Sequence, residues 1–318
     1  MLKQTVILGN YYNDAPMPLL VTGTIGIDTV ETPTASAEGV SGGSCAYFAA
    51  AAAFHHNPIR IVGAVGGDWP AEHKSILKSI NGLCLDGLEE REQSKTFAWG
   101  GKYFDNMNER ETLFTELGVL EEAPPSIPAS YQDSRVIFLA NSHPSIQLDL
   151  LNSFPSRQLA VADTMDLWIN IANDELHELF KHIDGLVIND SEAQQLTDIN
   201  DPIEAAQELI RRGPSFVIVK LGEHGSILVH PDGEYQIPAV ALSQEQVVDP
   251  TGAGDSFAGG FLGHLASCDE VSFENMKNAM KWGTITASFT LQSFGLEGLA
   301  NATKEQMQER MSSFEQTL

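Results

Sequence analysis

Small residues and one carboxylate crowd together in the segment VVDPTGAGDSFAGGF, residues 247–261. An apolar strand end leads into Gly252, Ala253, Gly254 and Asp255, and a helix is expected to follow. Small residues allow successive backbone N–H groups to turn toward one point, and the first turn of a helix adds a partial positive charge. Such a turn suits a phosphate, or the charge that develops during phosphoryl transfer.

Asp255 lies at the edge of this predicted turn. A carboxylate is a poor ligand for phosphate because like charges repel. The same carboxylate can accept a proton from an attacking hydroxyl, which is the role of a general base. The alternative is that Asp255 only caps the helix after a glycine turn, as aspartate often does.

The wider sequence favours the base. The segment DPTGAGDSF resembles, nearly residue for residue, the C-terminal signature of the ribokinase-like, or PfkB-type, carbohydrate kinases. The resemblance covers roughly residues 18–295, with several separated motifs in the family's order. It implies that Gly252, Ala253 and Gly254 form an anion hole and that Asp255 is the catalytic base. It also implies an enzyme that transfers the γ-phosphoryl group of ATP to a hydroxyl of a small, sugar-like substrate.

Two motifs that follow predicted strands resemble the family's nucleotide-binding parts. Asn189 and Glu192 match its NxxE motif, which holds Mg²⁺ largely through water and orients the phosphates; oxygen ligands and retained waters are what Mg²⁺ prefers. Lys220, Gly222 and Gly225 match its KxGxxG loop, where glycines permit close backbone approach and the lysine supplies positive charge near ATP. The alternatives are a capped helix start for the first motif and a plain β-turn for the second.

Residues nearer the N-terminus resemble the family's sugar-binding parts. The segment GTIGID ends in Asp28, which implies a carboxylate that accepts hydrogen bonds from substrate hydroxyls; the alternative is a turn residue after a strand. Gly42 and Gly43 match the glycine pair where backbone groups approach the sugar. Ribokinases proper carry Asn where this chain has Tyr47. An aromatic ring can stack on a sugar face or fill space, but it lacks the donor and acceptor of an amide, which argues against ribose itself.

Further positions complete the predicted site. Asn141 and Asp163 end predicted strands and are expected to line the pocket. Thr284 aligns with a family position that often lies beside adenine. Asp249, before the glycine turn, aligns with a monovalent-cation ligand found in part of the family, so K⁺ activation is a further implication. The segment GAVGGD, residues 63–68, also recurs in the family and is expected to be structural.

Composition excludes several other classes of protein. The 318 residues include 43 acidic and 18 basic side chains, a net charge of −25, so a nucleic-acid-binding face is not expected. An anionic nucleotide would then need local positive charge from helix N-termini, a few Lys or Arg side chains and a divalent cation. No apolar run long enough for a membrane span and no secretory signal are found. Three widely spaced cysteines fit a reducing cytoplasm.

The elements that must position these residues alternate regularly from Arg135 onward. Short apolar runs of β-branched type are separated by helix-length segments, which predicts a parallel sheet covered by helices on both faces. The expected fold is therefore α/β, a three-layer α/β/α, doubly wound, mostly parallel sheet. The expected helices are 144–154, 166–181, 191–212, about 254–267 and about 272–291, and an antiparallel hairpin joins SILVH to EYQIP.

Two segments do not follow this alternation of strands and helices. They predict a small β-sheet lid, about residues 29–42 and 95–118. In the second, Phe97, Trp99 and Tyr103 lie on one side of an alternating strand. An exposed apolar lid is costly in water, so a homodimer through the lid is expected. Residues 1–17 are interpreted as an N-terminal extension and 18–318 as one kinase domain.

Three alternatives remain beside a sugar kinase. The chain could be a nucleoside kinase of the same superfamily, which would consume ATP with inosine or adenosine but not with free sugars. It could instead be a catalytically silent sugar- or nucleotide-binding protein, although every catalytic residue type is present. A purely structural oligomer would show no ligand-induced thermal shift.

Overall fold

The main sheet of the computed structural model, which describes residues 17–318, contains nine strands. They are β1 (Leu19–Thr22), β4 (Ile59–Gly66), β5 (Leu83–Arg91), β8 (Val136–Leu139), β9 (Leu159–Ala162), β10 (Gly185–Asn189), β11 (Phe216–Lys220), β12 (Ser226–His230) and β13 (Gly233–Ile237). Their order is β13-β12-β11-β10-β9-β8-β1-β4-β5. Neighbours run parallel except at β11–β12 and β12–β13, which confirms the mostly parallel sheet and its hairpin. Except for Met17, the predicted extension lies outside the described residues.

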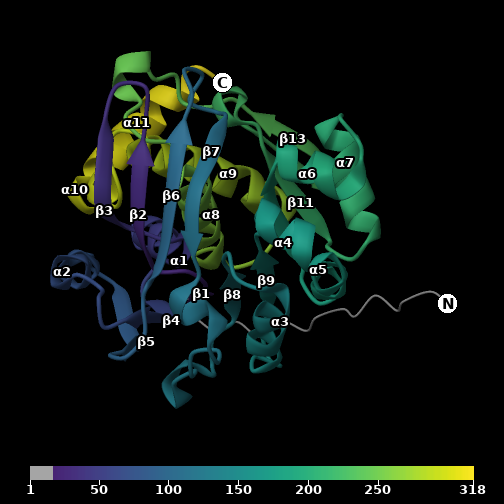
Figure 1. The fold of residues 1–318 in the computed structure, drawn as a ribbon. Helices are drawn as coiled ribbons and strands as arrows, with labels where there is room; N and C mark the ends of the chain where they lie inside the picture. The colour runs from purple at the N-terminus through teal and green to yellow at the C-terminus, as the bar shows by residue number, and fades with distance from the viewer. Residues whose placement is uncertain (1–16) are drawn as a thin grey trace.

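Helices cover both faces of this sheet, because successive strand residues point to opposite sides. Val21 of β1 packs in one core cluster and Leu20 in the other. The Val21 face is covered by α1 (Ser44–Ala52), α2 (Ala71–Ser79), α8 (Ala253–Ala266), α9 (Phe273–Thr290), α10 (Glu297–Asn301) and α11 (Lys304–Glu315). The Leu20 face is covered by α3 (Pro144–Asn152), α4 (Asp166–Ile171), α5 (Asn173–Phe180), α6 (Asp190–Thr197) and α7 (Pro202–Arg211). The three-layer α/β/α prediction is confirmed (Figure 1). Within residues 17–318 no helix has the length and hydropathy to cross a bilayer.

A second, four-stranded sheet forms the lid. Its strands are β2 (Gly26–Glu31), β3 (Ser36–Gly42), β6 (Phe97–Tyr103) and β7 (Arg110–Glu116), in the order β3-β2-β6-β7 (Figure 1). Val30, Phe97, Trp99 and Tyr103 form its own apolar cluster. The predicted lid segments contain these strands, except that β2 begins at Gly26 and therefore includes Asp28.

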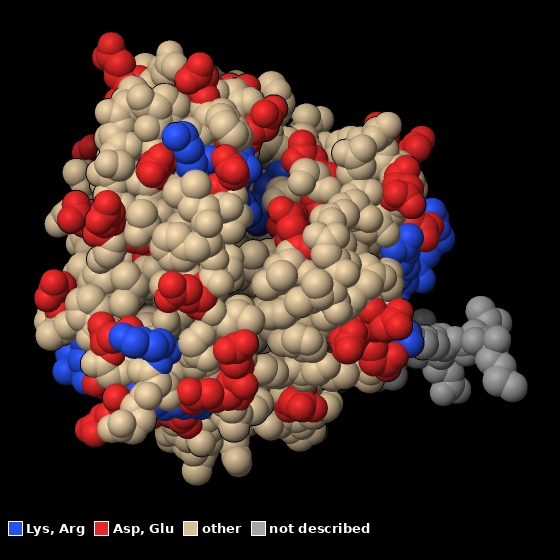
Figure 2. All heavy atoms as spheres, viewed as in Figure 1, with Lys and Arg blue, Asp and Glu red and all other residues tan. Residues whose placement is uncertain are grey.

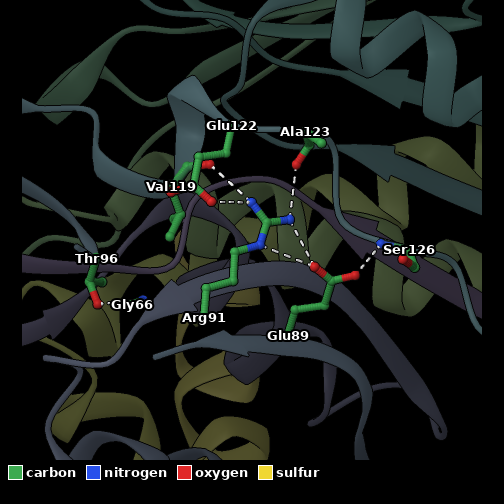
Figure 3. A network of polar contacts seen from close by, with 8 residues as sticks. All are labelled: Gly66, Glu89, Arg91, Thr96, Val119, Glu122, Ala123 and Ser126. Carbon is green, nitrogen blue, oxygen red and sulfur yellow. Dashed lines mark hydrogen bonds and ion pairs between the residues drawn. The ribbon is translucent and has the colours of Figure 1, made fainter. Parts of the chain in front are cut away.

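The chain that leaves the lid is fixed to the edge of the main sheet by one arginine (Figure 3). Arg91, at the end of β5, donates to Glu89 at 2.8 Å, to Glu122 at 3.1 Å and to the Ala123 carbonyl at 2.9 Å. Glu89 in turn accepts from the Ser126 amide at 2.6 Å. These bonds fix the segment between the lid and β8 to the end of β5.

Two predicted helices are each divided in two. The segment 166–181 is interrupted at Ala172, where the backbone leaves helical geometry between α4 and α5. The segment 191–212 is interrupted because Asp201 caps a new helix that starts at Pro202. Proline is favoured at the first position of a helix, and the aspartate side chain accepts the free amides there.

Candidate active site

The carboxyl-terminal edge of the main sheet gathers most of the predicted site. Asn189 and Lys220 end neighbouring parallel strands and are register partners. Asn141 and Asp163 follow β8 and β9 at the same edge. Asp163 lies beside Asp255, which is in the first turn of α8. Parallel strands place their ends at one edge, which is where ligands bind in such sheets.

The turn that begins α8 presents unpaired backbone amides. Gly252 is the N-cap residue, with a left-handed φ of 76°, and no side chain caps the helix. The Ala253 amide donates to Pro250 and the Ser256 amide to Gly252, but across residues 17–318 the amides of Gly252 and Gly254 have no protein acceptor. The N-cap alternative for Asp255 is therefore wrong, and the turn has the donors of an anion site.

Lys220 brings positive charge to this turn. A Cβ added to Gly254 would lie 2.6 Å from Lys220 Nζ, so the ammonium group lies directly against the turn. Burial raises the pKa of Asp255, and Lys220 opposes that rise by favouring the carboxylate. Burial raises the pKa of Asp163 well above its usual range, and the charge of Asp255 raises it further. The two buried carboxyl groups therefore affect each other's titration.

The NxxE segment has the predicted capping geometry. Asn189 Oδ1 accepts from the Glu192 amide at 2.8 Å, and Glu192 Oε2 accepts from the Asn189 amide at 2.9 Å. Burial raises the pKa of Glu192, while Lys220 lowers it. The capping box uses one of the two Glu192 carboxylate oxygens. Among residues 17–318 no group of three or more His, Cys, Asp or Glu side chains could hold a metal.

The predicted nucleotide loop follows β11. Gly222 and Gly225 both have positive φ, 57° and 91°. A side chain at Gly225 would collide with the Ile237 carbonyl, so this glycine permits packing against the end of β13. Thr284 lies in α9, which packs on β12 and β13, and its hydroxyl donates to the Met280 carbonyl at 2.9 Å.

Asp28 meets the glycine pair at the base of the lid. A side chain at Gly42 would collide with the Asp28 carboxylate, and the Gly43 amide donates to that carboxylate. Asp28 is 3% exposed, and within residues 17–318 its Oδ1 atom has no hydrogen-bond partner. Burial raises the pKa of Asp28 to about 8, with a contribution from the charge of Asp249. A buried carboxylate oxygen without a partner marks a place where a ligand hydroxyl fits.

Tyr47 and Asn141 both contact other residues of the protein at the site. Tyr47 is 1% exposed, and its ring lies against Gly252, where an added Cβ would collide with it. The ring fills space beneath the anion turn, and among the described residues its hydroxyl has no hydrogen-bond partner. Asn141 accepts from Trp168 Nε1 at 2.8 Å and contacts Met165 Sδ at 3.0 Å, so its amide is held on one side of the pocket.

Asp249 is fully buried before the same turn. Its Oδ1 atom accepts from the Thr251 amide at 2.8 Å, whereas its Oδ2 atom has no hydrogen-bond partner in the part of the chain that the structure describes. Burial raises the pKa of Asp249 to about 6. A buried, unpartnered carboxylate oxygen is compatible with a monovalent cation.

The lid contributes side chains that the sequence motifs did not reveal. Tyr103 reaches Thr251, whose hydroxyl donates to the Tyr103 hydroxyl at 3.2 Å. The Arg110 guanidinium lies 5.6 Å from the Trp99 ring centroid and favours the charged form of Asp255, which lowers its pKa. Figure 2 shows Lys or Arg side chains on the floor of a hollow in this face, with Asp and Glu side chains near its rim. The alternating pattern of β6 indicated a strand, but nothing in it showed which loops the strand would touch.

The sequence and the fold have clear relatives. Residues 137–302 match the family described as pfkB family carbohydrate kinase. The cytidine kinase of Thermococcus kodakarensis is 30% identical over 280 residues, which cover 84% of this chain and 98% of that protein.

Solved structures share the fold. The nucleoside kinase of Methanocaldococcus jannaschii superposes with a TM-score of 0.74 at 20% identity, covering 94% of this chain and 99% of that one. A ribokinase from Cryptococcus neoformans in complex with ADP gives a TM-score of 0.75 at 22% identity, covering 92% of this chain and 99% of that one. With the family match over half of its length and a relative of this similarity, the chain belongs to the pfkB family of carbohydrate kinases.

Proposed function

We propose that this protein transfers the γ-phosphoryl group of ATP to a hydroxyl of a small, sugar-bearing substrate, with Asp255 as the general base. The observation that carries the proposal is the turn before α8, where the amides of Gly252 and Gly254 have no protein acceptor among the described residues. Lys220 lies against the same turn, and the Asp255 carboxyl group stands at its edge. Hydrogen-bond donors, a positive charge and a base therefore meet at the start of one helix.

Each group has a distinct part in the transfer. Asp28 accepts hydrogen bonds from substrate hydroxyls and so orients the acceptor. Asp255 takes the proton of the attacking hydroxyl as the new O–P bond forms and the bond to ADP breaks. The amides of Gly252 and Gly254, together with Lys220, stabilise the negative charge on the phosphoryl oxygens. Closure of the lid excludes water and limits ATP hydrolysis.

Two cations fit the residues of the site. Mg²⁺ would neutralise the negative charge that develops on the phosphates of ATP. Glu192 would hold it through water, because one carboxylate oxygen is not used by the capping box. The unpartnered Oδ2 atom of buried Asp249 would serve as a ligand for K⁺.

A nucleoside is the second candidate acceptor. It is favoured by the relative named cytidine kinase, of which this chain covers 98%. Relatives named ribokinase also occur; one from Lactococcus lactis is 24% identical over 228 residues. Both acceptor classes present sugar hydroxyls to Asp28, so the same catalytic groups serve either one.

We extend the proposal to a homodimer formed through the lid. Strand β7 pairs only with β6 in the lid sheet and is exposed along its whole length. Phe104, Leu113 and Phe114 are large apolar side chains exposed on this part of the lid. A second copy would cover them, because exposed edges and apolar patches favour association. Three unpaired cysteines support a reducing compartment such as the cytoplasm.

An ADP-release screen tests the function. The protein is incubated with ATP and Mg²⁺, with and without K⁺, and with pentoses, hexoses, sugar acids, sugar phosphates and nucleosides. We expect ADP release that depends on one acceptor class and is lost in Asp255→Asn. Binding of ATP and an acceptor, seen as a thermal shift without any ADP release, would instead support the catalytically silent alternative.

A further inference from the structure

One side-chain hydrogen bond joins the lid to the anion turn. The Thr251 hydroxyl donates to the Tyr103 hydroxyl at 3.2 Å, across 148 positions of sequence. Thr251 immediately precedes Gly252, and Tyr103 is the last residue of β6. The Tyr103 ring is buried in the lid cluster beside Phe97 and Trp99. Any movement of the lid therefore moves the partner of Thr251.

On the side away from the lid, the turn packs against the Tyr47 ring, and the Ser256 amide donates to the Gly252 carbonyl. The Thr251 amide donates to Asp249 Oδ1 at 2.8 Å, which fixes the residue on one side. Gly252 follows with a φ of 76° and no Cβ to limit its rotation. A small rotation at Gly252 would redirect its own amide and that of Gly254. The Tyr103 contact restrains this rotation from the lid side.

The lid also touches the predicted nucleotide loop. Asn108 lies in the turn between β6 and β7, and a Cβ added to Gly222 would lie 2.6 Å from Asn108 Oδ1. The lid thus contacts both loops that would hold ATP, in addition to the Asp28 region that would hold the acceptor. Because its strands form one hydrogen-bonded sheet, the acceptor end and the phosphate end of the lid move together.

We propose that Tyr103 is a positioning residue that couples lid closure to the anion turn. Its hydroxyl holds Thr251 so that the amides of Gly252 and Gly254 point at the phosphoryl group while the lid has the position seen in this structure. This inference rests on the proposed function and adds to it a mechanical link between the two substrate sites. The consequence is that an acceptor bound beneath the lid, by holding the lid in this position, keeps the turn aligned for transfer.

Kinetics of four variants test the link. Tyr103→Phe removes the hydroxyl and keeps the ring, and kcat should fall roughly three- to tenfold, as expected for one lost hydrogen bond. The acceptor KM should change less than about twofold, because the loss is in the transition state. Thr251→Val should have a similar effect, and the double variant should be no worse than the more severe single one. Tyr235→Phe, on β13, is the matched control and should keep wild-type kcat. Wild-type kcat in Tyr103→Phe, or additive losses in the double variant, would overturn the proposal.

Amide hydrogen exchange gives a readout that needs no acceptor. In the free protein, the peptide over residues 250–256 should exchange faster in Tyr103→Phe than in wild type, and Tyr235→Phe should match wild type. If the wild type phosphorylates no acceptor but this difference is present, the proposed function fails and the coupling stands. If exchange over 250–256 is unchanged, the coupling fails, even where kcat has fallen, because the hydroxyl would then act elsewhere.

Discussion

At the scale of single residues, Asp163 and Asp255 show how two identical side chains take different parts. Both carboxyl groups have raised pKa values because they are buried together. The contact with Asp163 lowers the pKa of Asp255 against the effect of burial, whereas the charge of Asp255 raises the pKa of Asp163. A base works only when it is ionised. Activity should therefore be lost as the pH falls through the pKa of Asp255.

Substitution of Asp163 tests this division of roles. Asp163→Asn retains a hydrogen-bond donor toward Asp255, so kcat and its acid limb should stay close to wild type. Asp163→Ala removes the donor, so the pKa of Asp255 should rise and the acid limb of kcat should move to higher pH. The measurement is kcat against pH for the three proteins. Superimposable profiles for Asp163→Ala and wild type would contradict the assignment.

The sequence located the residues that belong to local motifs and missed those that depend on the placement of the lid. Gly252, Asp255 and Lys220 could be predicted because their chemistry lies within a few residues of a strand or helix end. Tyr103 and Asn108 could not, because their partners lie far away in sequence. The aromatic type of Tyr47 argued against ribose, but the place of its ring depends on packing against Gly252.

At the scale of elements, the start of α8 depends on a glycine that no other residue can replace. Gly252→Ala would place an alanine at a φ of 76° and drive its Cβ into the Tyr47 ring. We expect kcat to fall about tenfold or more, because the turn must shift by enough to misalign its amides. Gly39→Ala is the matched control: its φ is 68°, but nothing lies within 4 Å of the added Cβ. In this control, backbone strain should lower the free energy of unfolding in urea by about 1 kcal/mol, and kcat should stay at the wild-type value. Equal kcat losses in both variants would contradict this account.

The interior strands of the main sheet could be predicted from the sequence, but its edge strand β5 could not. Runs such as LLVT, VIFL and FVIVK are apolar except at their last positions, Thr22 and Lys220, because parallel strands are buried on both faces. Strand β5 was missed because its sequence, LCLDGLEER, places acidic residues along a half-exposed edge. Helix α1 ends at Ala52, after which the backbone amides of Phe54 and His55 bond in tighter turns. Helix α11 was also missed, since its sequence is mostly polar.

At the scale of the whole molecule, the distribution of charge over the surface bears on nucleotide binding. The net charge of −25 repels free nucleotides in general. Some Lys or Arg side chains nevertheless lie on the floor of a hollow (Figure 2). That arrangement agrees with the expectation from composition that a nucleotide would need local compensation.

The association of two copies is tested at this scale as well. Leu113 is 43% exposed on β7, and Leu113→Lys should prevent dimerisation by placing charge in the proposed interface. The molar mass from light scattering should fall to that of one chain. Val271→Lys, at a similarly exposed apolar position outside the lid, should leave the mass unchanged. A wild type that is monomeric at all concentrations would remove the dimer from the account.

The central claim is that the Asp255 carboxylate deprotonates an acceptor held beside the anion turn. The most direct measurement is kcat of Asp255→Asn with the best acceptor from the screen, beside Asp232→Asn as an exposed control. The account predicts a fall of about 100-fold or more for Asp255→Asn, with ATP and acceptor binding retained and a melting temperature no lower than wild type, since a buried charge is removed. Turnover near the wild-type value in this variant would contradict it.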